Sequence, residues 1–388
     1  MISSKILSIC IPVYNRKYIF KWCLISACEA CKGYENIVEI VISDNASTED
    51  IYSVVNDVKN MYPSIDIIYN CNSSNLGVAR NFFKVVKDAM GQFCWVIGSD
   101  DFIKPYSINT ILNILHENQD IDFISCSFDL MRIEDSLKIS DKEMQTNISE
   151  QLKNPNYLRP NGAPTQSFKV DKLDYIIDPI YNNVLLGSLM AGIFRRDLWN
   201  KVEVDKEQLN GYDSLITIYP HIYVYSNGFL GRKAYYCGQP LITVGEGTRE
   251  WSTDTGKSFW ESSLPVIYFK VFAEIISSYK SNGLEQESYI KCENWIASFA
   301  GDLLIPIIWK KYVSKEPVSN IDKIFPLDTS LIFIDNETYK QTALNKLRSE
   351  YYAMENQYNN MEKSSIGNMI INFFKDSLEN NSFMNRRV

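Results

Sequence analysis

The sequence predicts an α/β fold in which helices cover both faces of a parallel β-sheet, followed by a second domain made of helices. Over about the first hundred residues, short apolar runs rich in Ile and Val alternate with segments of helical spacing, which is typical of βαβ units. After Ser258 the apolar residues recur mainly at helical spacing. We therefore expect an α/β domain over residues 1–250 and a helical domain over residues 251–388.

Four strands and three helices are expected in the first part of the chain. The apolar runs at 7–13, 38–43, 65–69 and 93–97 predict strands, and the segments 17–31, 50–61 and 77–89 predict helices. Strands with so few polar residues suit a sheet that is buried on both faces. We therefore expect these strands to be parallel and joined by right-handed crossovers.

The rest of the chain supports a coarser prediction. Residues 132–167 are polar and contain several Pro and Asn residues, which predicts a long connection. Apolar residues return at 187–199 and 215–224, and the strand-like segment 234–244 is expected to complete the first domain. Helical spacing in the second domain is found at 262–279, 289–312 and 338–362.

Composition limits the classes of function. Lys and Arg total 39 and Asp and Glu total 47, a net charge of −8, so we expect no broad basic surface for nucleic acid. The nine Cys residues lack the paired spacing of zinc sites or disulfide frameworks, which indicates the reducing cytoplasm. No segment approaches the roughly 18 uncharged apolar residues that span a bilayer, and the N-terminal apolar run predicts a strand rather than a signal peptide. The protein is expected to be soluble or peripherally attached to a membrane.

Polar residues follow three of the expected strands at their carboxyl ends. These clusters are Tyr14-Asn15-Arg16, Asp44-Asn45-Ala46-Ser47 and Ser99-Asp100-Asp101. Ligands of parallel sheets bind beyond the carboxyl ends of the strands, so we expect the clusters to converge on one site. The sequence contains neither the Gly-x-Gly-x-x-Gly motif of dinucleotide-binding proteins nor a P-loop, which argues against hydride transfer and kinase chemistry.

The turn Gly98-Ser99-Asp100-Asp101 carries the strongest signal of chemistry. Two adjacent carboxylates at a sheet edge can share a divalent cation, Mn²⁺ or Mg²⁺, with phosphate oxygens and water. The alternative is an ordinary Asp-rich turn in which Asp101 caps the next helix. Asp44 is suited to accept hydrogen bonds from a base or ribose, while Ser47 or Thr48 is expected to cap the following helix.

Four segments, in this order, resemble motifs of the family-two glycosyltransferases, whose Rossmann-like GT-A fold binds nucleotide sugars. They are Leu7-Ser8-Ile9-Cys10-Ile11-Pro12-Val13-Tyr14-Asn15-Arg16, Ile42-Ser43-Asp44-Asn45-Ala46-Ser47-Thr48, Asn75-Leu76-Gly77-Val78-Ala79-Arg80-Asn81 and Gly98-Ser99-Asp100-Asp101. The resemblance covers roughly the first 110 residues with high specificity and extends more loosely to about residue 245. Within the family, the chain is most similar to abequosyltransferase-like enzymes of bacterial O-antigen synthesis.

The resemblance implies a nucleotide-diphosphate-sugar donor, a glycan acceptor and a bound Mn²⁺ or Mg²⁺. Residues implied to bind the nucleotide sugar are Pro12, Tyr14, Asn15, Arg16, Asp44, Asn75, Arg80, Ser99 and Asp100. Pro12, Tyr14 and Asn15 would line the nucleobase pocket, and Arg80 would lie near the diphosphate. Asp100 and Asp101 would hold the metal. The family pattern is Asp-x-Asp-Asp, and Gly98 replaces its leading Asp, so Asp100 carries more of the metal-ligand role.

Inverting members of the family use a carboxylate to deprotonate the acceptor hydroxyl, often from a Glu-Asp pair. Here Tyr212-Asp213 precedes an apolar helical segment, so Asp213 is the candidate catalytic base. Its alternative role is that of a helix N-cap. His221 is a base, a metal ligand or a core histidine, and we favour the core histidine.

Two further segments are assigned to the acceptor side or to a lid. Residues 187–192 resemble a segment that borders the acceptor in relatives, so Ser188 is a candidate acceptor-binding residue. Arg249 and Trp251 are suited to phosphate contact and sugar stacking in a lid over the donor. An interdomain linker is the alternative for that second segment.

The chain ends in an amphipathic segment. Apolar residues in 366–378 fall largely on one helical face, which fits contact with a membrane that carries a lipid-linked acceptor. Few basic residues accompany this face, so packing within the chain or in a homo-oligomer is favoured.

Two departures from the family pattern leave an alternative function open. Gly98 replaces the leading Asp and Tyr212 stands where Glu is common, which would also fit a catalytically silent nucleotide-sugar-binding or scaffold protein. A processive synthase would need membrane spans and a Gln-x-x-Arg-Trp motif, which the sequence lacks.

Overall fold

The computed structural model describes residues 5–132, 156, 158–211, 213–246, 267–308, 336–338, 341–342 and 345. The chain divides into two compact units. One consists of Met1–Glu250 with Ser277–Tyr289, and the other of Trp251–Ile276 with Ile290–Val388. The boundary near residue 250 and the role of the C-terminal region stay predictions.

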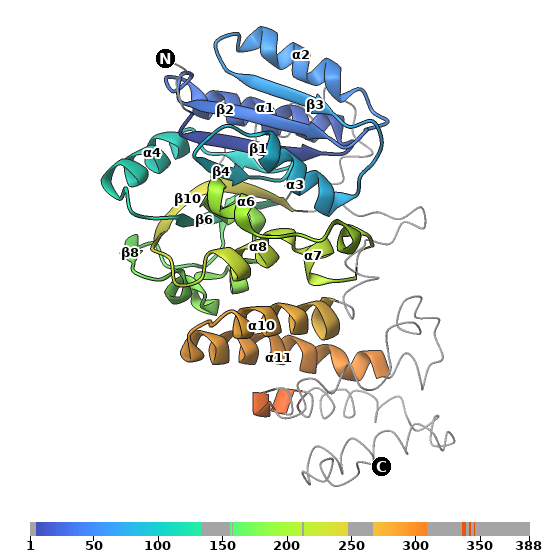
Figure 1. The fold of residues 1–388 in the computed structure, drawn as a ribbon, viewed down its shortest axis with the longest axis vertical. Coiled ribbons are helices and arrows are strands. Elements are labelled where there is room, and N and C mark those ends of the chain that lie inside the picture. Colours follow the sequence, from blue (N-terminus) through green and yellow to red (C-terminus); the bar gives the residue numbers. More distant parts are fainter. Residues whose placement is uncertain are drawn as a thin grey trace. The chain divides into compact units, whose positions relative to one another are not determined.

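A mixed ten-stranded sheet forms the centre of the first unit (Figure 1). Its order is β3-β2-β1-β4-β9-β6-β10-β5, with β7 beside β6 and β8 beside β10. The strands are β1 (Leu7–Val13), β2 (Val38–Asp44), β3 (Ile67–Cys71), β4 (Phe93–Val96), β5 (Phe102–Ile103), β6 (Phe123–Arg132), β7 (Leu158–Pro160), β8 (Phe168–Val170), β9 (Gly192–Arg195) and β10 (Ala234–Glu246). The expected parallel pairing holds for β3, β2, β1 and β4, whereas β9 runs antiparallel between β4 and β6.

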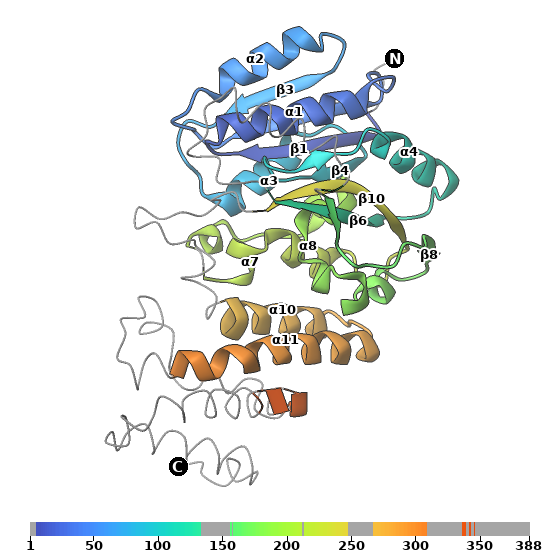
Figure 2. The same cartoon turned by 180° about the vertical axis from the view of Figure 1, so that it is seen from behind.

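Helices cover both faces of this sheet, with α1 on one face and α3 on the opposite face (Figure 2). The α-helices are α1 (Lys17–Cys31), α2 (Ile51–Met61), α3 (Val78–Asp88), α4 (Ser107–Glu117), α6 (Arg196–Lys201), α7 (Leu215–Ile218), α8 (Pro220–Gly228), α10 (Phe272–Ser281) and α11 (Gln286–Ile308). Short helical turns are η3 (Leu173–Ile176), η4 (Pro179–Tyr181), η5 (Val184–Leu186), η6 (Leu189–Ala191), η7 (Lys206–Leu209) and η8 (Ile267–Val271). Among the described residues, no helix combines the length and apolar character needed to cross a membrane.

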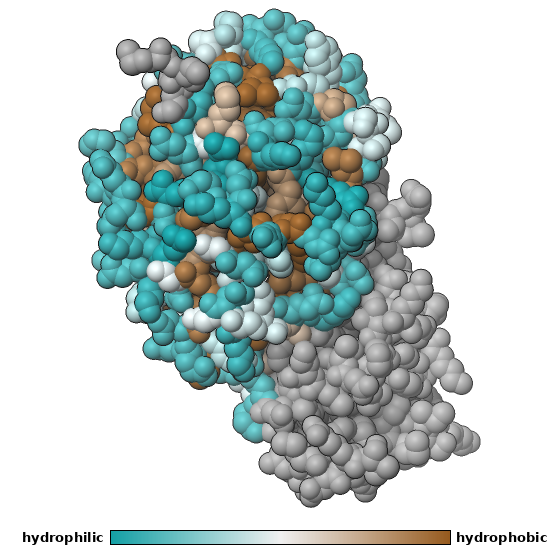
Figure 3. Space-filling model, viewed as in Figure 1, coloured by the Kyte–Doolittle hydropathy of each residue, from teal (hydrophilic) through white to brown (hydrophobic). Residues whose placement is uncertain are grey.

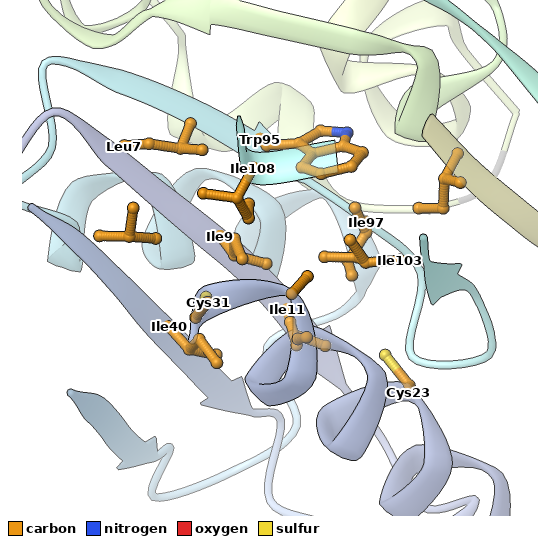
Figure 4. Close-up of a cluster of buried hydrophobic side chains, with 14 of the residues drawn as sticks. Leu7, Ile9, Ile11, Cys23, Cys31, Ile40, Trp95, Ile97, Ile103 and Ile108 are labelled. Carbon is orange, nitrogen blue, oxygen red and sulfur yellow. The ribbon is translucent and has the colours of Figure 1, made fainter. Parts of the chain in front are cut away.

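The hydrophobic core is formed by buried side chains of β1 and of the strands and helices around it (Figure 4). Leu7, Ile9 and Ile11 alternate along β1 and so point to the same face of the sheet, where all three are fully buried. Each such side chain contributes about 1.5–3 kcal/mol through burial. Trp95 on β4 is also fully buried, and its indole Nε1 donates a 2.7 Å hydrogen bond to the carbonyl of Met190. The surface of the first unit in Figure 3 is mostly hydrophilic, with groups of hydrophobic residues among the polar ones.

All seven elements predicted for the first part of the chain are present, and β1 and α1 have the predicted bounds. The prediction that Ser47 or Thr48 caps α2 is wrong. Asp50 is the N-cap, and its Oδ1 accepts a 3.0 Å hydrogen bond from the Ser53 amide. The segment 215–224 is divided into α7 and α8, because Pro220 begins a new helix. The segment 132–167 contains the short strand β7, and α4 and β6 were not predicted.

Candidate active site

The acidic turn lies between β4 and β5 and is buried. Ser99, Asp100 and Asp101 are only 5–7% exposed. The Gly98 amide donates to Asp101 Oδ2 at 2.8 Å, and the Asp101 amide donates to the Gly98 carbonyl at 3.2 Å. Asp101 therefore closes its own turn. It does not cap α4, whose N-cap residue is Tyr106.

Burial and the neighbouring Asp100 disfavour ionisation of Asp101. Burial is the main cause that raises the pKa of Asp101 well above its usual range, and the charge of Asp100 raises it further. Hydrogen bonds from backbone amides and the charge of Arg16 act in the opposite direction. A buried carboxyl pair of this kind is stabilised by a proton or by a cation.

Arg16 connects the end of β1 to the acidic turn. Its Nη1 donates to Asp100 Oδ2 at 3.1 Å, and the two side chains are 23% and 8% exposed. Arg16 occupies the N-cap position of α1 in the left-handed region, with φ of 64°, and its side chain makes no capping hydrogen bond. The side chain of this cap residue therefore serves the sheet edge and not the helix.

The loops after β1 and β2 are bonded to each other. The Asn15 amide donates to Ser47 Oγ at 2.7 Å, and Asn15 Oδ1 accepts from the amides of Thr48 at 2.9 Å and Glu49 at 3.2 Å. The Lys17 amide at the start of α1 donates to Glu49 Oε2 at 2.7 Å. Together with the Arg16 contact, these bonds bring the three polar clusters to one edge of the sheet.

Asp44 has hydrogen bonds to both of its carboxylate oxygens. Its Oδ1 accepts from the amide and hydroxyl of Ser47 at 2.9 and 2.6 Å, and its Oδ2 accepts from the Tyr69 hydroxyl at 2.7 Å. Burial and this contact raise the pKa of Tyr69. Sequence reasoning missed Tyr69. The register of β2 and β3 would have identified it. Ile42 pairs with Tyr69, and Asp44 lies two residues further along β2 on the same face of the sheet.

Asn75 is exposed in the loop before α3, where it is hydrogen-bonded to the buried Asn45. Its Oδ1 accepts from Asn45 Nδ2 at 2.8 Å, and Asn45 Oδ1 accepts from the Leu76 amide at 2.8 Å. This network fixes the loop from which α3 begins. Arg80 on the first turn of α3 donates from Nη2 to the Lys206 carbonyl at 2.9 Å, so it contacts η7.

Asp213 lies just before α7 and is exposed. Ser214 is the N-cap residue of α7, and its amide donates to Thr217 Oγ1 at 3.1 Å. The alternative in which Asp213 caps this helix is therefore wrong. Ile216 of α7 packs in one apolar cluster with Ala79 of α3, which holds this segment against α3. Tyr212 lies outside the described residues.

His221 is buried against residues 187–192, the segment that was assigned to the acceptor. Its Nε2 is 3.1 Å from the Gly187 carbonyl, and burial lowers its pKa to about 4. A neutral, 4% exposed ring of this kind is a core histidine. The neighbouring Ser188 is half-buried, and its amide donates to Asn183 Oδ1 at 2.7 Å.

The remaining predicted site residues differ in exposure. Pro12 is half-buried at the end of β1, and Tyr14 directly after that strand is 43% exposed. Tyr14 is thus accessible to a ligand at this edge. Arg249 and Trp251, predicted for a lid, lie outside the described residues.

Comparison with known proteins identifies the domain that carries this edge. Residues 8–166 match the sequence profile of the family described as "Glycosyl transferase family 2". We call the matched residues 8–166 the family-2 domain. The chain is similar to abequosyltransferase RfbV of Salmonella typhimurium, with 27% identity over 61% of this chain and 66% of the relative. It is also similar to the poly(ribitol-phosphate) beta-glucosyltransferase of Bacillus spizizenii, with 32% identity over 29% of this chain and 18% of that relative. The chain thus spans less than two thirds of the length of these relatives.

The fold of the family-2 domain agrees with solved structures. The structure of S. aureus TarS 1–349 in complex with UDP has a TM-score of 0.51 and 14% identity, covering 99% of this chain and 94% of that chain. The structure of TarS 1–349 alone has a TM-score of 0.51 and 13% identity, covering 87% of this chain and 81% of that one. These similarities confirm the predicted GT-A fold.

The family-2 domain offers two carboxylates to a metal, those of Asp100 and Asp101. No group of three or more His, Cys, Asp or Glu residues suited to a metal occurs in the described part of the chain. A Cβ at Gly98 would lie 2.8 Å from Asp100 Oδ1 and 2.8 Å from Asp101 Oδ2, so both carboxylates gather over this glycine. Mg²⁺ commonly binds one or two carboxylates together with phosphate oxygens and water. The two carboxylates are therefore chemically suited to an Mn²⁺ or Mg²⁺ ion.

Proposed function

We propose that the protein is a glycosyltransferase that transfers one sugar from a nucleotide-diphosphate sugar to a glycan of a bacterial surface polysaccharide, an O-antigen or capsule precursor. One observation carries this proposal. A family-2 domain places a buried pair of carboxylates, together with Arg16, at the carboxyl edge of its sheet. Ligands of open α/β sheets bind at this edge.

The donor is bound by residues from the three polar clusters and from α3. Pro12, Tyr14 and Asn15 surround the nucleobase, and Asp44 contacts the base or ribose once the Tyr69 hydroxyl yields its place. Ser99 and Asn75 shape the loops beside the donor, and Arg80 and Arg16 face the diphosphate. Asp100 and Asp101 would hold Mn²⁺ or Mg²⁺, which when bound neutralises charge on the departing diphosphate.

Asp213 is the proposed base. It takes the proton of the attacking acceptor hydroxyl while the bond from that oxygen to the anomeric carbon forms. The bond between the anomeric carbon and the phosphate oxygen breaks, and the nucleoside diphosphate leaves. Attack opposite the leaving group inverts the anomeric configuration. The exposure of Asp213 and its position just before α7 support this role.

The acceptor is proposed to be a glycan, carried on a lipid at the cytoplasmic face of the membrane. One relative is named for abequosyl transfer and another for glucosyl transfer to poly(ribitol-phosphate), which supports a surface polymer as acceptor. Ser188 lies in the segment assigned to the acceptor and is proposed to contact the acceptor, whereas His221 packs against Gly187 of that segment. The apolar segment 366–378, expected to contact the membrane or a second copy of the chain, lies outside the described residues.

A panel of UDP-, CDP-, GDP- and dTDP-sugars tests the donor site by thermal shift with and without Mn²⁺. One nucleotide class is expected to stabilise the protein, since ligand at 100 times Kd contributes about 2.7 kcal/mol. The shift should require Mn²⁺ and be lost in Asp100→Ala. Asp57→Ala, which removes an exposed carboxylate on α2, is the matched control. No shift with any donor would contradict the proposal.

Asp213→Asn tests the base. We expect turnover to fall by about 10²- to 10⁴-fold while donor affinity is unchanged. Donor binding without turnover in the wild type, across a broad acceptor panel, would instead favour the silent binding or scaffold protein. The presence of only two clustered carboxylates in the described part of the site is the observation that favours this second candidate.

A further inference from the structure

Arg16 already neutralises one of the two proposed metal ligands. The guanidinium is 3.1 Å from Asp100 Oδ2, and the Asp100 side chain is 8% exposed. A guanidinium stays protonated at every physiological pH. Without ligand, the negative charge of Asp100 is thus compensated by a cation of the chain itself.

The backbone at Arg16 is fixed, whereas the side chain has room to move. Asn15 and Arg16 both adopt positive φ, 58° and 64°, although neither is glycine. Bonds from Asn15 to Ser47, Thr48 and Glu49 hold this conformation. The Arg16 side chain is 23% exposed and makes no capping bond. Loss of the Asp100 contact would therefore leave the loop in place and release only the guanidinium.

We propose that Arg16 is a built-in competitor of the metal, which holds Asp100 until the divalent cation arrives and then binds the donor's diphosphate. The inference rests on the proposed function, because it takes the metal and the diphosphate to bind at this turn. A divalent cation and a guanidinium on the same carboxylate repel each other. Since the Arg16 side chain is long and partly exposed, the guanidinium moves away and the metal stays. A displaced guanidinium finds its best partner in a phosphate group, which it binds through two parallel hydrogen bonds.

This arrangement couples metal to donor. Metal alone binds weakly, because it must break the Arg16 ion pair without a replacement partner for the guanidinium. Metal with a nucleoside diphosphate binds more strongly, because the diphosphate supplies that partner. Positive coupling between two ligands requires such a difference between states, and it is reciprocal.

The test measures Mn²⁺ affinity by the EPR signal of free Mn²⁺, first without nucleotide and then with UDP, CDP, GDP or dTDP. Variants are Arg16→Gln, Arg16→Lys, Asp100→Asn and the matched control Lys21→Gln, which removes another cation of α1. We expect Arg16→Gln to bind Mn²⁺ alone about 10-fold more tightly than wild type, and to bind the preferred nucleoside diphosphate at saturating Mn²⁺ about 10-fold more weakly. Arg16→Lys should retain most of the coupling, and Lys21→Gln all of it.

The opposite signs of the two changes distinguish this role from others. A purely structural Arg16 would lose both affinities, and circular dichroism and melting temperature would report the damage. An Arg16 that only binds phosphate would leave affinity for Mn²⁺ alone unchanged, which overturns the inference but leaves the proposed function intact. If the wild type binds no nucleoside diphosphate with Mn²⁺, the proposed donor site fails. If neither the wild type nor Arg16→Gln binds Mn²⁺, the competition fails too.

Discussion

The two ends of the parallel strands both bury a carboxylate beside a glycine, yet they are built differently. At the amino end, Glu39 on β2 is fully buried and its Oε1 accepts from Ser8 Oγ at 2.5 Å and from the amides of Met90 and Gly91 at 2.6 and 3.2 Å. At the carboxyl end, Asp100 accepts a hydrogen bond from the long side chain of Arg16, which is partly exposed. The carboxylate at the amino end accepts from backbone amides, whereas Asp100 at the carboxyl end accepts from a partly exposed side chain.

The glycines show the same difference. A Cβ at Gly91 would lie 2.6 Å from the Ser8 amide nitrogen and 2.8 Å from the Leu7 carbonyl carbon, which are backbone atoms. A Cβ at Gly98 would meet only carboxylate ends, at 2.8 Å. Backbone in a sheet cannot shift cheaply, but a side chain can rotate. The amino end therefore serves stability and the carboxyl end leaves room for ligands.

The largest expected effect is on turnover at the carboxyl end. Asp100→Asn should reduce sugar transfer by about 10²- to 10³-fold, because it removes charge at the site where the diphosphate departs. Stability should change little, since the substitution relieves repulsion between two buried carboxylates. Steady-state transfer assays and thermal melting of the same preparation measure both. Wild-type turnover in Asp100→Asn would show that the acidic turn is structural.

Alanine at the two glycines should affect stability very differently. Gly91→Ala is expected to destabilise the protein by about 3 kcal/mol, because overpacking against backbone forces strands β1 and β4 apart. Gly98→Ala should cost less, about 1–2 kcal/mol, because it displaces two carboxylate side chains and the bond from the Gly98 amide to Asp101, but no strand backbone. Urea denaturation of both variants provides the comparison. Equal losses would contradict the distinction between a rigid end and an adaptable end.

The buried histidine extends the contrast to pH. The pKa of His221 is about 4 in the folded protein, below the ordinary value near 6.5, so the unfolded chain takes up the proton first as pH falls. Stability is therefore highest above about pH 6.5 and falls as the pH is lowered towards 4. At pH 5 the loss amounts to about 2 kcal/mol.

The measurement is the free energy of unfolding in urea at pH 7 and pH 5, for wild type and His221→Gln. The variant should lose less stability on acidification than the wild type. His116→Gln changes the exposed histidine on α4 and is the matched control. A variant that follows the wild-type pH dependence would mean that His221 is protonated without cost.

Local pattern was enough to predict the first half of the sheet. The bounds of β1 and α1 follow from an apolar run and from helical spacing, which neighbouring residues determine. Convergence of the polar clusters followed from the rule for parallel strands. The placement of β9 between β4 and β6 could not be predicted, because it depends on pairing between strands far apart in sequence.

The contacts within the site were beyond sequence reasoning for the same reason. Arg16 and Asp100 are 84 residues apart, and Tyr69 reaches Asp44 only in the observed register of β2 and β3. Ser47 was expected to cap α2, but Asp44 and Asn15 already use its hydroxyl. The residue types in the site were thus predictable, whereas their partners required the fold.

The smallest expected effect compares the two buried carboxyl groups by removing their charge. Glu39→Gln keeps an oxygen for Ser8 and the two amides, but it weakens three hydrogen bonds to a charged group, so we expect a loss of about 1 kcal/mol. Asp101→Asn should cost less than Glu39→Gln at pH 7, because burial and the charge of Asp100 disfavour the charge that this substitution removes. Urea denaturation with comparison of m-values measures both. If Asp101→Asn is the more destabilising, the charge of Asp101 stabilises the acidic turn as much as the charge of Glu39 stabilises the amino end.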